Sequence, residues 1–236
     1  TAKMLTSEFI EGVRIDQIYG IKKDINIEKL TKVASEIFFY QSFRDGFFHG
    51  DLHPGNIFVD QSGKIIAIDF GIMGRLNLDD RKFLARLFNF LLNKEFFEIA
   101  KLHQENGMLD KDTDLDKLTQ EIRIIATPIL DKPIGDISMG NLFGEILALS
   151  RKFNIKIQAK FCLLQKSMIM AEGIARQINP KANIWQTAEP MMKQWISDNM
   201  KYDFLFEKIN DKSFIPKELV EIFQKIDKLL IKFFKF

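Results

Sequence analysis

The sequence predicts a mainly α-helical domain with an opening strand and one small β-hairpin in its first third. Beyond Asn77 the apolar residues recur at helical spacing almost throughout, whereas short β-branched runs flanking a turn lie before that point. Hydrophobic residues make up 46% of the 236 positions and charged residues 28%, a balance typical of globular rather than disordered proteins. The chain is therefore expected to fold, and one compact domain is the simplest arrangement.

The N-terminal part is expected to contain a strand followed by a long helix. Met4 to Ile10 has the composition of a strand, and Glu11 and Gly12 follow as a turn. From Ile27 to Arg44 apolar residues stand three and four apart, and the run stops before Gly46, a good helix terminator. Because the sequence starts close to the predicted strand, we expect the chain to be part of a larger protein.

A β-hairpin is predicted next. Ile57 to Asp60 and Ile65 to Asp69 are short apolar runs, and the four residues between them have the composition of a turn. Pairing around the middle of that turn sets Asn56 opposite Asp69, and directly opposed residues bring their Cβ atoms to about 5 Å. Two oxygen-bearing side chains are thus expected to meet.

The remainder is predicted to form a helical bundle. The methionines between residues 160 and 178 lie on an apolar helical stripe, where they most simply fill gaps in the core. Asp131 to Gly140 is polar and contains Gly and Pro, as loops do. Helices are expected at Asp79 to Asn93, Glu95 to Asn106, Leu115 to Leu130, Asn141 to Phe153, Gln158 to Ile178, Glu189 to Met200 and Lys217 to Phe236.

Charge and cysteine content narrow the function classes. The 34 basic and 32 acidic residues leave a net charge of +2, so no overall field favours nucleic acid as a partner. Cys162 is the only cysteine, which excludes an internal disulfide and favours a cytoplasmic location. The sequence shows neither a secretory leader nor the run of about 20 apolar residues needed to cross a bilayer.

Residues 49 to 56 and 69 to 71 form a constellation that suits phosphoryl transfer. Such sites contain carboxylates that hold Mg²⁺ and one that orients the attacking hydroxyl or water. Asp51 and Asn56 have the Asp-x-x-x-x-Asn spacing of a kinase catalytic loop, and the Asp-Phe-Gly triplet at 69 to 71 follows the hairpin, as in kinases. Asp51 is the expected catalytic base, and Asn56 and Asp69 are the expected ligands of Mg²⁺ bound with ATP.

Two other interpretations of these residues are weaker. A surface turn that happens to contain two aspartates and an asparagine does not explain the joint spacing of both motifs. A zinc site at His49 and His53 is disfavoured because nearby Gly and Pro residues prevent the helix that would place both on one face. The residues expected instead to shape and brace the loop are Gly50, Pro54, Gly55, His49, His53 and Gly71.

The sequence resembles the UbiB family of atypical kinases, whose members support ubiquinone biosynthesis. The resemblance covers about residues 1 to 185 and rests on FRDGFFHGDLHPGNIFV, IDFGIMGRL, LTSEFIEG and MAEGIARQINP. It implies a protein-kinase-like C-terminal lobe over residues 1 to 185, with a hinge strand at 1 to 12, and a helical extension at 186 to 236. It also implies that Asp51 is catalytic, that Asn56 and Asp69 bind magnesium, and that the backbone of Glu8, Phe9 and Ile10 meets adenine beside a gatekeeper, Ser7.

The family also implies an N-terminal lobe with a KxGQ motif, an Ala-rich loop and a Lys and Glu pair, and this sequence contains none of them. We therefore expect the isolated chain to bind ATP poorly and to be inactive, with that lobe as a partner from the same protein. Gly50 replaces the Arg of the protein-kinase HRD triplet, and no APE follows DFG before the helix at Asp79, so a protein substrate is doubtful.

Three functions follow from these features. The favoured one is an ATP- and Mg²⁺-dependent phosphotransferase or ATPase of the UbiB type, which acts with quinone lipids, their precursors or other ubiquinone-biosynthesis proteins. The second is a small-molecule phosphotransferase resembling aminoglycoside or choline kinases, although GIMGRL after the metal aspartate favours UbiB. The third is a nucleotide-sensing pseudokinase scaffold, which the intact Asp51, Asn56 and Asp69 disfavour.

The C-terminal segment from Lys217 to Phe236 is predicted to be a basic amphipathic helix. Its apolar stripe favours docking on the bundle with a solvated lysine face. Contact with a membrane surface is the alternative, because UbiB-like proteins act near membrane lipids and commonly continue into transmembrane helices. In that case the segment is juxtamembrane, and the protein is cytoplasmic and peripheral to the inner membrane.

Overall fold

The computed structural model describes residues 3 to 4, 6 to 20, 25 to 130, 139 to 182 and 184 to 200. The chain divides into two compact units, residues 1 to 192 and 193 to 236. Helices dominate the described residues and the strands form two small antiparallel sheets, which confirms the predicted mainly α fold. The predicted helix from Lys217 to Phe236 lies outside the described residues.

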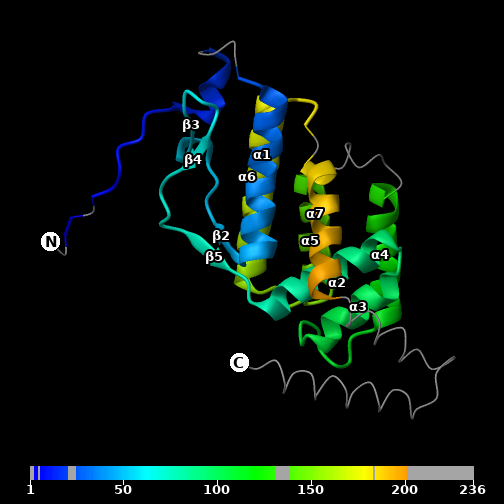
Figure 1. Ribbon diagram of the computed structural model, residues 1–236. Coiled ribbons are helices and arrows are strands. Elements are labelled where there is room, and N and C mark those ends of the chain that lie inside the picture. The colour runs from blue at the N-terminus through cyan, green and yellow to red at the C-terminus, as the bar shows by residue number, and fades with distance from the viewer. Residues whose placement is uncertain (1–2, 5, 21–24, 131–138, 183, 201–236) are drawn as a thin grey trace, which may run out of the picture. The chain divides into compact units, whose positions relative to one another are not determined.

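The elements follow one another from short strands to long helices (Figure 1). They are β1 (Val13–Arg14), the 3-10 helix η1 (Ile15–Gly20), α1 (Ile27–Phe39), the π-helical turn η2 (Tyr40–Asp45), β2 (Phe47–His49), the 3-10 turn η3 (Pro54–Asn56), β3 (Ile57–Val59), β4 (Ile65–Ala67), β5 (Met73–Arg75), α2 (Leu78–Leu92), α3 (Phe96–Glu105), α4 (Leu115–Leu130), α5 (Met139–Lys152), α6 (Ala159–Ile178) and α7 (Ile184–Asn199).

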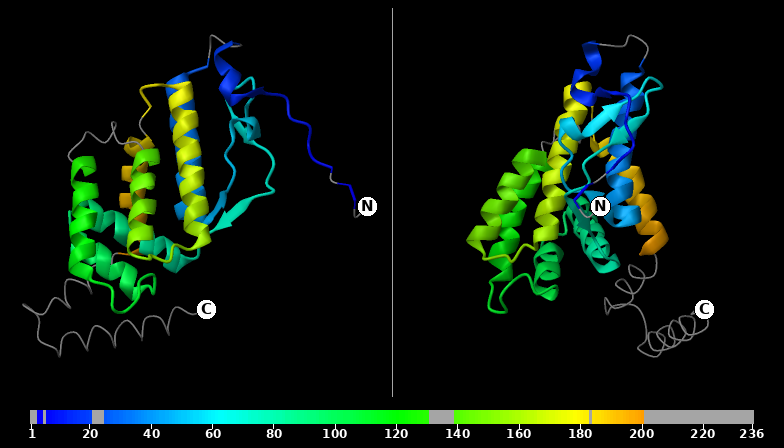
Figure 2. Two further views of the ribbon diagram at one scale, coloured as in Figure 1. Left: turned by 180° about the vertical axis from the view of Figure 1, so that it is seen from behind. Right: turned by 90° about the vertical axis from the view of Figure 1, so that its left-hand side faces the viewer.

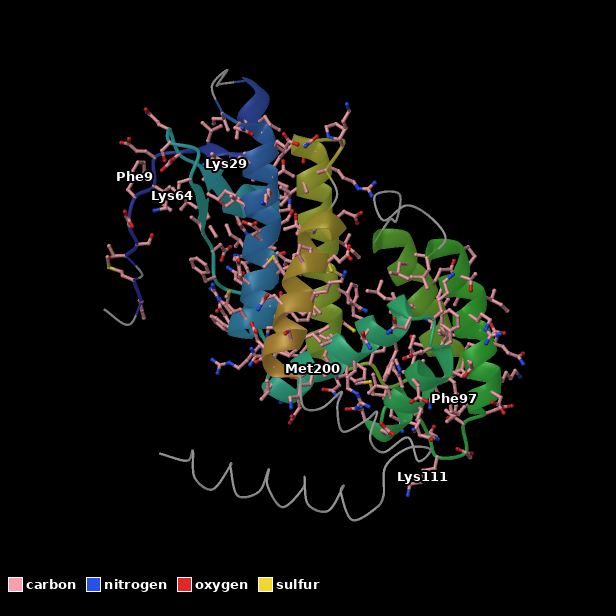
Figure 3. All side chains as sticks on the ribbon, turned by 45° about the vertical axis from the view of Figure 1, so that its right-hand side comes forward. Phe9, Lys29, Lys64, Phe97, Lys111 and Met200 are labelled. Atoms are coloured by element: carbon pink, nitrogen blue, oxygen red, sulfur yellow. The ribbon has the colours of Figure 1, made fainter. Side chains whose placement is uncertain are left out.

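The predicted strand at Met4 to Ile10 is wrong for the residues that the structure describes. They have no regular structure, and Phe9 is 89% exposed (Figure 3). The strand lies farther along, at β1, where Val13 pairs with Val59 and Arg14 with Phe58 of β3. Composition alone misplaced it because a strand forms only where a neighbouring backbone supplies its hydrogen bonds.

The predicted hairpin is present, but its register differs by one residue. Strand β3 pairs with β4 so that Ile57 faces Ala67 and Val59 faces Ile65. The Asn56 carbonyl oxygen therefore accepts a hydrogen bond from the amide of Ile68 at 2.9 Å, and the prediction that Asn56 lies opposite Asp69 is wrong.

The turn of the hairpin explains the shift. Gly63 has φ +84°, and the carboxylate of Asp60 accepts hydrogen bonds from the amides of Ser62 and Lys64. The amide of Asp60 donates to the Lys64 carbonyl oxygen at 3.0 Å, so the loop consists of the three residues 61 to 63, and a residue with positive φ is typical of three-residue hairpin loops. Pairing about the midpoint of a four-residue turn had assumed an even number.

A second sheet, β2 with β5, was not predicted. Phe47, Phe48 and His49 pair antiparallel with Arg75, Gly74 and Met73. A Cβ atom on Gly74 would lie 2.1 Å from the Phe48 ring, so only glycine fits this position. Strands of three residues give too short a pattern to recognise from periodicity, yet this pair encloses both predicted motifs.

The long helix predicted from Ile27 to Arg44 is largely confirmed. The side chain of Asn26 caps α1 by accepting the amide hydrogen of Lys29 at 2.8 Å, and Gly46 ends the helical run with φ +65°. The structure differs in its last turn, which is the π-helical η2. Helices α1 and α6 lie side by side (Figure 2), and Phe38 of α1 is buried in the core.

The later helices agree with the predictions to within a few residues, except that α7 starts five residues earlier, at Ile184 rather than Glu189. Pro128 and Pro190 lie inside α4 and α7. Of the predicted loop from Asp131 to Gly140, residues 139 and 140 belong to α5 and the rest lies outside the described residues. No helix among the described residues is both long enough and apolar enough to span a membrane.

Candidate active site

The catalytic-loop motif occupies the connection between β2 and β3. His49 at its start is buried, and its Nδ1 accepts a hydrogen bond from the Asp51 amide at 3.1 Å. Its Nε2 must then carry the proton, and it donates to the carbonyl oxygen of Ile68 at 3.1 Å. One imidazole therefore ties the loop to the residue that precedes the Asp-Phe-Gly triplet.

His53 and the glycines shape the rest of the loop. The His53 ring is turned back, and its Nδ1 accepts the amide hydrogen of Gly55 at 3.1 Å. The following residues form the 3-10 turn η3, with Pro54 in its first turn. Gly50 lies against α6: a Cβ there would come within 2.8 Å of Ile72 and 3.0 Å of Leu163.

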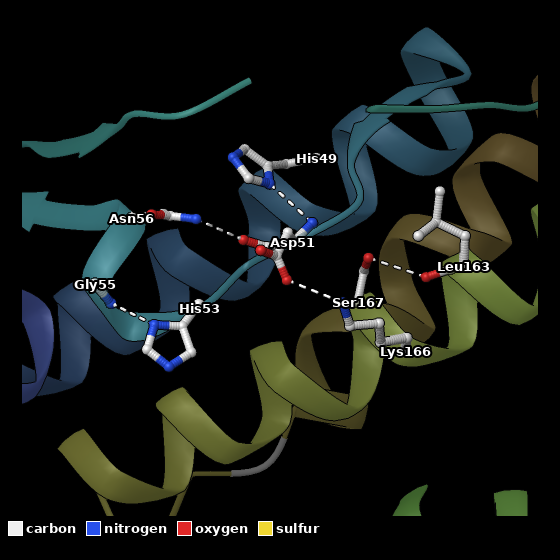
Figure 4. A network of polar contacts seen from close by, with 8 residues as sticks. All are labelled: His49, Asp51, His53, Gly55, Asn56, Leu163, Lys166 and Ser167. Atoms are coloured by element: carbon white, nitrogen blue, oxygen red, sulfur yellow. Dashed lines mark hydrogen bonds and ion pairs between the residues drawn. The ribbon is translucent and has the colours of Figure 1, made fainter. Parts of the chain in front are cut away.

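The Asn56 side chain is held against the catalytic loop. Its Nδ2 donates a hydrogen bond to the carbonyl oxygen of Asp51 at 3.1 Å (Figure 4). With the amide nitrogen engaged in this way, Oδ1 is the atom left to bind a cation. Because the ladder pairs Asn56 with Ile68, Asp69 follows one residue beyond the paired position.

Asp69 departs from strand geometry. Its φ is +57°, an uncommon conformation for a residue with a side chain, and it is exposed. Its Oδ1 accepts the amide hydrogen of Gly71 at 3.3 Å. The intervening Phe70 is 59% exposed and lies 5.6 Å from the His49 ring, measured between centroids.

Asp51 has a partner that the sequence did not reveal. Nζ of Lys166, on α6, donates to Asp51 Oδ1 at 2.9 Å. This hydrogen bond lowers the pKa of the Asp51 carboxyl below its usual value. The two residues are 115 positions apart. No local spacing could relate them.

The predicted nucleotide hinge is not brought to this site. Ser7, Glu8 and Phe9 are exposed, and the ribbon of this segment leads away from the helices (Figure 1). The described residues thus bring together Asp51, Asn56 and the Asp69 triplet but not Glu8, Phe9 and Ile10, whose role stays a prediction.

The donor set suits a hard cation that keeps other ligands. The Asn56 amide oxygen and the Asp69 carboxylate are oxygen donors of the kind that Mg²⁺ prefers, and Mg²⁺ usually takes its remaining ligands from water and substrate phosphates. Among the described residues no cluster of three or more His, Cys, Asp or Glu side chains could hold a metal ion.

Two family models match the chain in succession. Residues 1 to 103 match the ABC1 atypical kinase-like domain, and residues 122 to 183 match the UbiB helical domain. The first match contains both predicted motifs, and the second contains the whole of α6 with Lys166.

A curated relative matches over most of the chain. It is described as "Probable protein kinase UbiB", from Sodalis glossinidius (strain morsitans), and is 35% identical over 215 residues. The match covers 89% of this chain and 40% of the relative, so the chain spans about two fifths of that protein's length. Taken together, these matches show that the chain belongs to the UbiB family of atypical kinase-like proteins.

Proposed function

We propose that this chain carries the catalytic loop and metal ligands of an ATP- and Mg²⁺-dependent phosphotransferase or ATPase of the UbiB type, which supports ubiquinone biosynthesis. The single observation that carries the proposal is the tethering of Asn56 to Asp51 beside the Asp69 triplet. Residues 13 places apart in sequence thereby belong to one polar site. Membership of the UbiB family favours this function over an aminoglycoside or choline kinase.

Each side chain has a distinct task in this proposal. Asp51 accepts the proton of the attacking hydroxyl or water, and its depressed pKa keeps it ionised and able to do so. Asn56 and Asp69 hold Mg²⁺, which neutralises charge on the phosphates when bound. His49 fixes the spacing of the two motifs through its two ring nitrogens.

The remaining parts of the proposal concern the whole protein. Glu8, Phe9 and Ile10 meet adenine through their backbone once an N-terminal lobe covers the nucleotide. The partners are quinone lipids, their precursors or other ubiquinone-biosynthesis proteins. The protein works in the cytoplasm at the inner-membrane surface, where residues 186 to 236 form its helical extension.

The test is Asp69→Ala in the full-length protein. Loss of this carboxylate leaves triphosphate charge unneutralised in the transition state, so Mg²⁺-dependent ATP hydrolysis should be abolished. Asp112→Ala is the matched control, because Asp112 is an exposed aspartate in the connection between α3 and α4. Hydrolysis by Asp69→Ala at the rate of that control would refute the assignment.

A further inference from the structure

Helix α6 places the ammonium group of Lys166 at the catalytic loop. Lys166 Nζ lies 2.9 Å from Asp51 Oδ1, and the two side chains are 52% and 32% exposed (Figure 4). Lys166 belongs to the part of the chain that matches the UbiB helical domain, whereas Asp51 belongs to the kinase-like part. The ion pair therefore joins the two matched parts at the proposed base.

Stability does not account for this pair. Exposed ion pairs contribute about 0 to 1 kcal/mol, and α6 is already fixed against the loop by the close approach of Leu163 to Gly50. Lys156 and Asp110 form a comparable exposed pair, with Lys156 Nζ 2.6 Å from Asp110 Oδ1, and this pair does not involve the motifs. Both pairs join an exposed lysine to a partly exposed aspartate, but only the pair of Lys166 contains the proposed base, Asp51.

The motif-bearing segment places no Lys or Arg side chain at Asp51. Between residues 46 and 77 its only Lys and Arg side chains are Lys64 and Arg75. Lys64 lies at the turn of the hairpin, and the Arg75 guanidinium lies over the Phe47 ring. Lys166 is the one Lys or Arg within ion-pair distance of Asp51 among the residues that the structure describes.

Position and chemistry give this ammonium a role. An oxygen held by Asp51 for in-line attack lies within about 3.5 Å of the phosphorus that it attacks, so the equatorial phosphoryl oxygens come close to Asp51 as well. An ammonium has three donors, and one of them serves Asp51. Building on the proposed function, we propose that Lys166 is a catalytic residue that donates hydrogen bonds to the transferred phosphoryl group.

The proposed step transfers the γ-phosphoryl group of ATP to the acceptor oxygen. The acceptor oxygen forms a bond to the γ-phosphorus of ATP, and the bond from that phosphorus to the bridging oxygen breaks. The electron pair of the broken bond stays on the β-phosphate of ADP, and the proton of the acceptor passes to Asp51. Negative charge spreads over the equatorial oxygens during transfer, and these are the atoms that Lys166 Nζ contacts.

The test compares Lys166→Met, Lys166→Arg and the control Lys156→Met in the full-length protein. Lys166→Met should lower the turnover of ATP roughly 100- to 1,000-fold, the loss typical of one transition-state donor. Lys166→Arg should recover part of the turnover because it keeps the charge. Lys156→Met should behave as wild type, since Lys156 pairs with Asp110 away from the site.

A binding measurement separates catalysis from structure. ADP with Mg²⁺ and aluminium fluoride mimics the transferring phosphoryl group, and transition-state mimics report interactions that the ground state lacks. Lys166→Met should weaken binding of this mimic, whereas the affinity of the variant for ADP and its melting temperature should stay at the wild-type values. A residue that only stabilised the loop would lower all three together.

An active wild-type protein in which Lys166→Met retains full turnover, or retains full affinity for the mimic, overturns the role of Lys166 alone. A full-length wild-type protein that neither hydrolyses ATP nor binds the mimic overturns the proposed function, and the role of Lys166 with it. Parallel loss of ADP affinity and melting temperature in Lys166→Met assigns the lysine to structure.

Discussion

The segment from Gly46 to Asn77 and the helices on either side of it in the sequence hold their shapes by different means. In the segment, strands of three residues are joined by backbone hydrogen bonds, such as those from Gly50 to Ile72 and from Leu76 to Gly46, each 2.8 Å long. In the helices, buried apolar side chains pack on one another, as Phe83 and Phe161 do with ring centroids 5.4 Å apart. Chemistry and stability are thus largely carried by different residues.

The largest expected effect is on the chemistry of the segment. Asp51→Ala should lower turnover by about 10² to 10⁴, the usual contribution of a positioned base. It should leave much of the nucleotide affinity in place, because a base acts on the nucleophile rather than on bound ATP. Steady-state kinetics with calorimetric ATP titration of the full-length protein measure both quantities. Equal losses of affinity and turnover would contradict the role of Asp51 as the base.

Substitution in the core of the helices should lower the stability of the protein. Phe38 is 1% exposed and its ring meets that of Phe39 edge to face at 5.2 Å. Phe38→Ala removes a buried aromatic side chain, so it should cost about 3 to 5 kcal/mol of unfolding free energy. Denaturant unfolding checks this, with Phe97→Ala at an exposed aromatic position as the control. A cost no greater than that of the control would show that α1 is not part of the core.

His103 should make the stability of the helices sensitive to acid. Burial lowers the pKa of His103, whose Nδ1 lies 2.7 Å from the Ile99 carbonyl oxygen. The unfolded chain therefore binds a proton at a higher pH than the folded chain. The stability that neutral His103 contributes to the folded state is fully present above the unfolded pKa of about 6.5. Below that pH the free energy of unfolding falls by about 1.4 kcal/mol per pH unit until the folded pKa is reached.

Melting temperatures measured from pH 8 to pH 5 test this expectation. His103→Gln should melt at a lower temperature than wild type at high pH but should lose less stability on acidification. Identical pH profiles for the two proteins would mean that another group, rather than His103, governs acid sensitivity.

The smallest expected effect concerns the boundary between the two regions. Asn77 caps α2: its Oδ1 accepts the Asp80 amide hydrogen at 2.8 Å, and Asp80 Oδ2 accepts the Asn77 amide hydrogen at 3.0 Å. Asn77→Ala should cost about 1 kcal/mol, the typical value of an N-cap. Asn26→Ala, which removes the cap of α1, is the matched comparison. A loss of turnover in Asn77→Ala without loss of stability would show that the regions are coupled.

The sequence by itself determined the elements whose causes are local. Helical periodicity placed α2 to α6 to within a few residues, and Gly46 marked the end of the helical run from Ile27. The spacings of Asp51, Asn56 and the Asp69 triplet predicted one polar site, because loop chemistry depends on residue type and short separation. These predictions needed no knowledge of distant contacts.

Only the tertiary structure decided what depends on distant partners. The strand formed at Val13 rather than Met4 because β3 supplies its hydrogen bonds there, and the odd loop at Gly63 shifted Asn56 to face Ile68. Lys166 met Asp51 because α6 packs on the catalytic loop where Gly50 leaves room. Such contacts join residues far apart in sequence, and no local pattern records them.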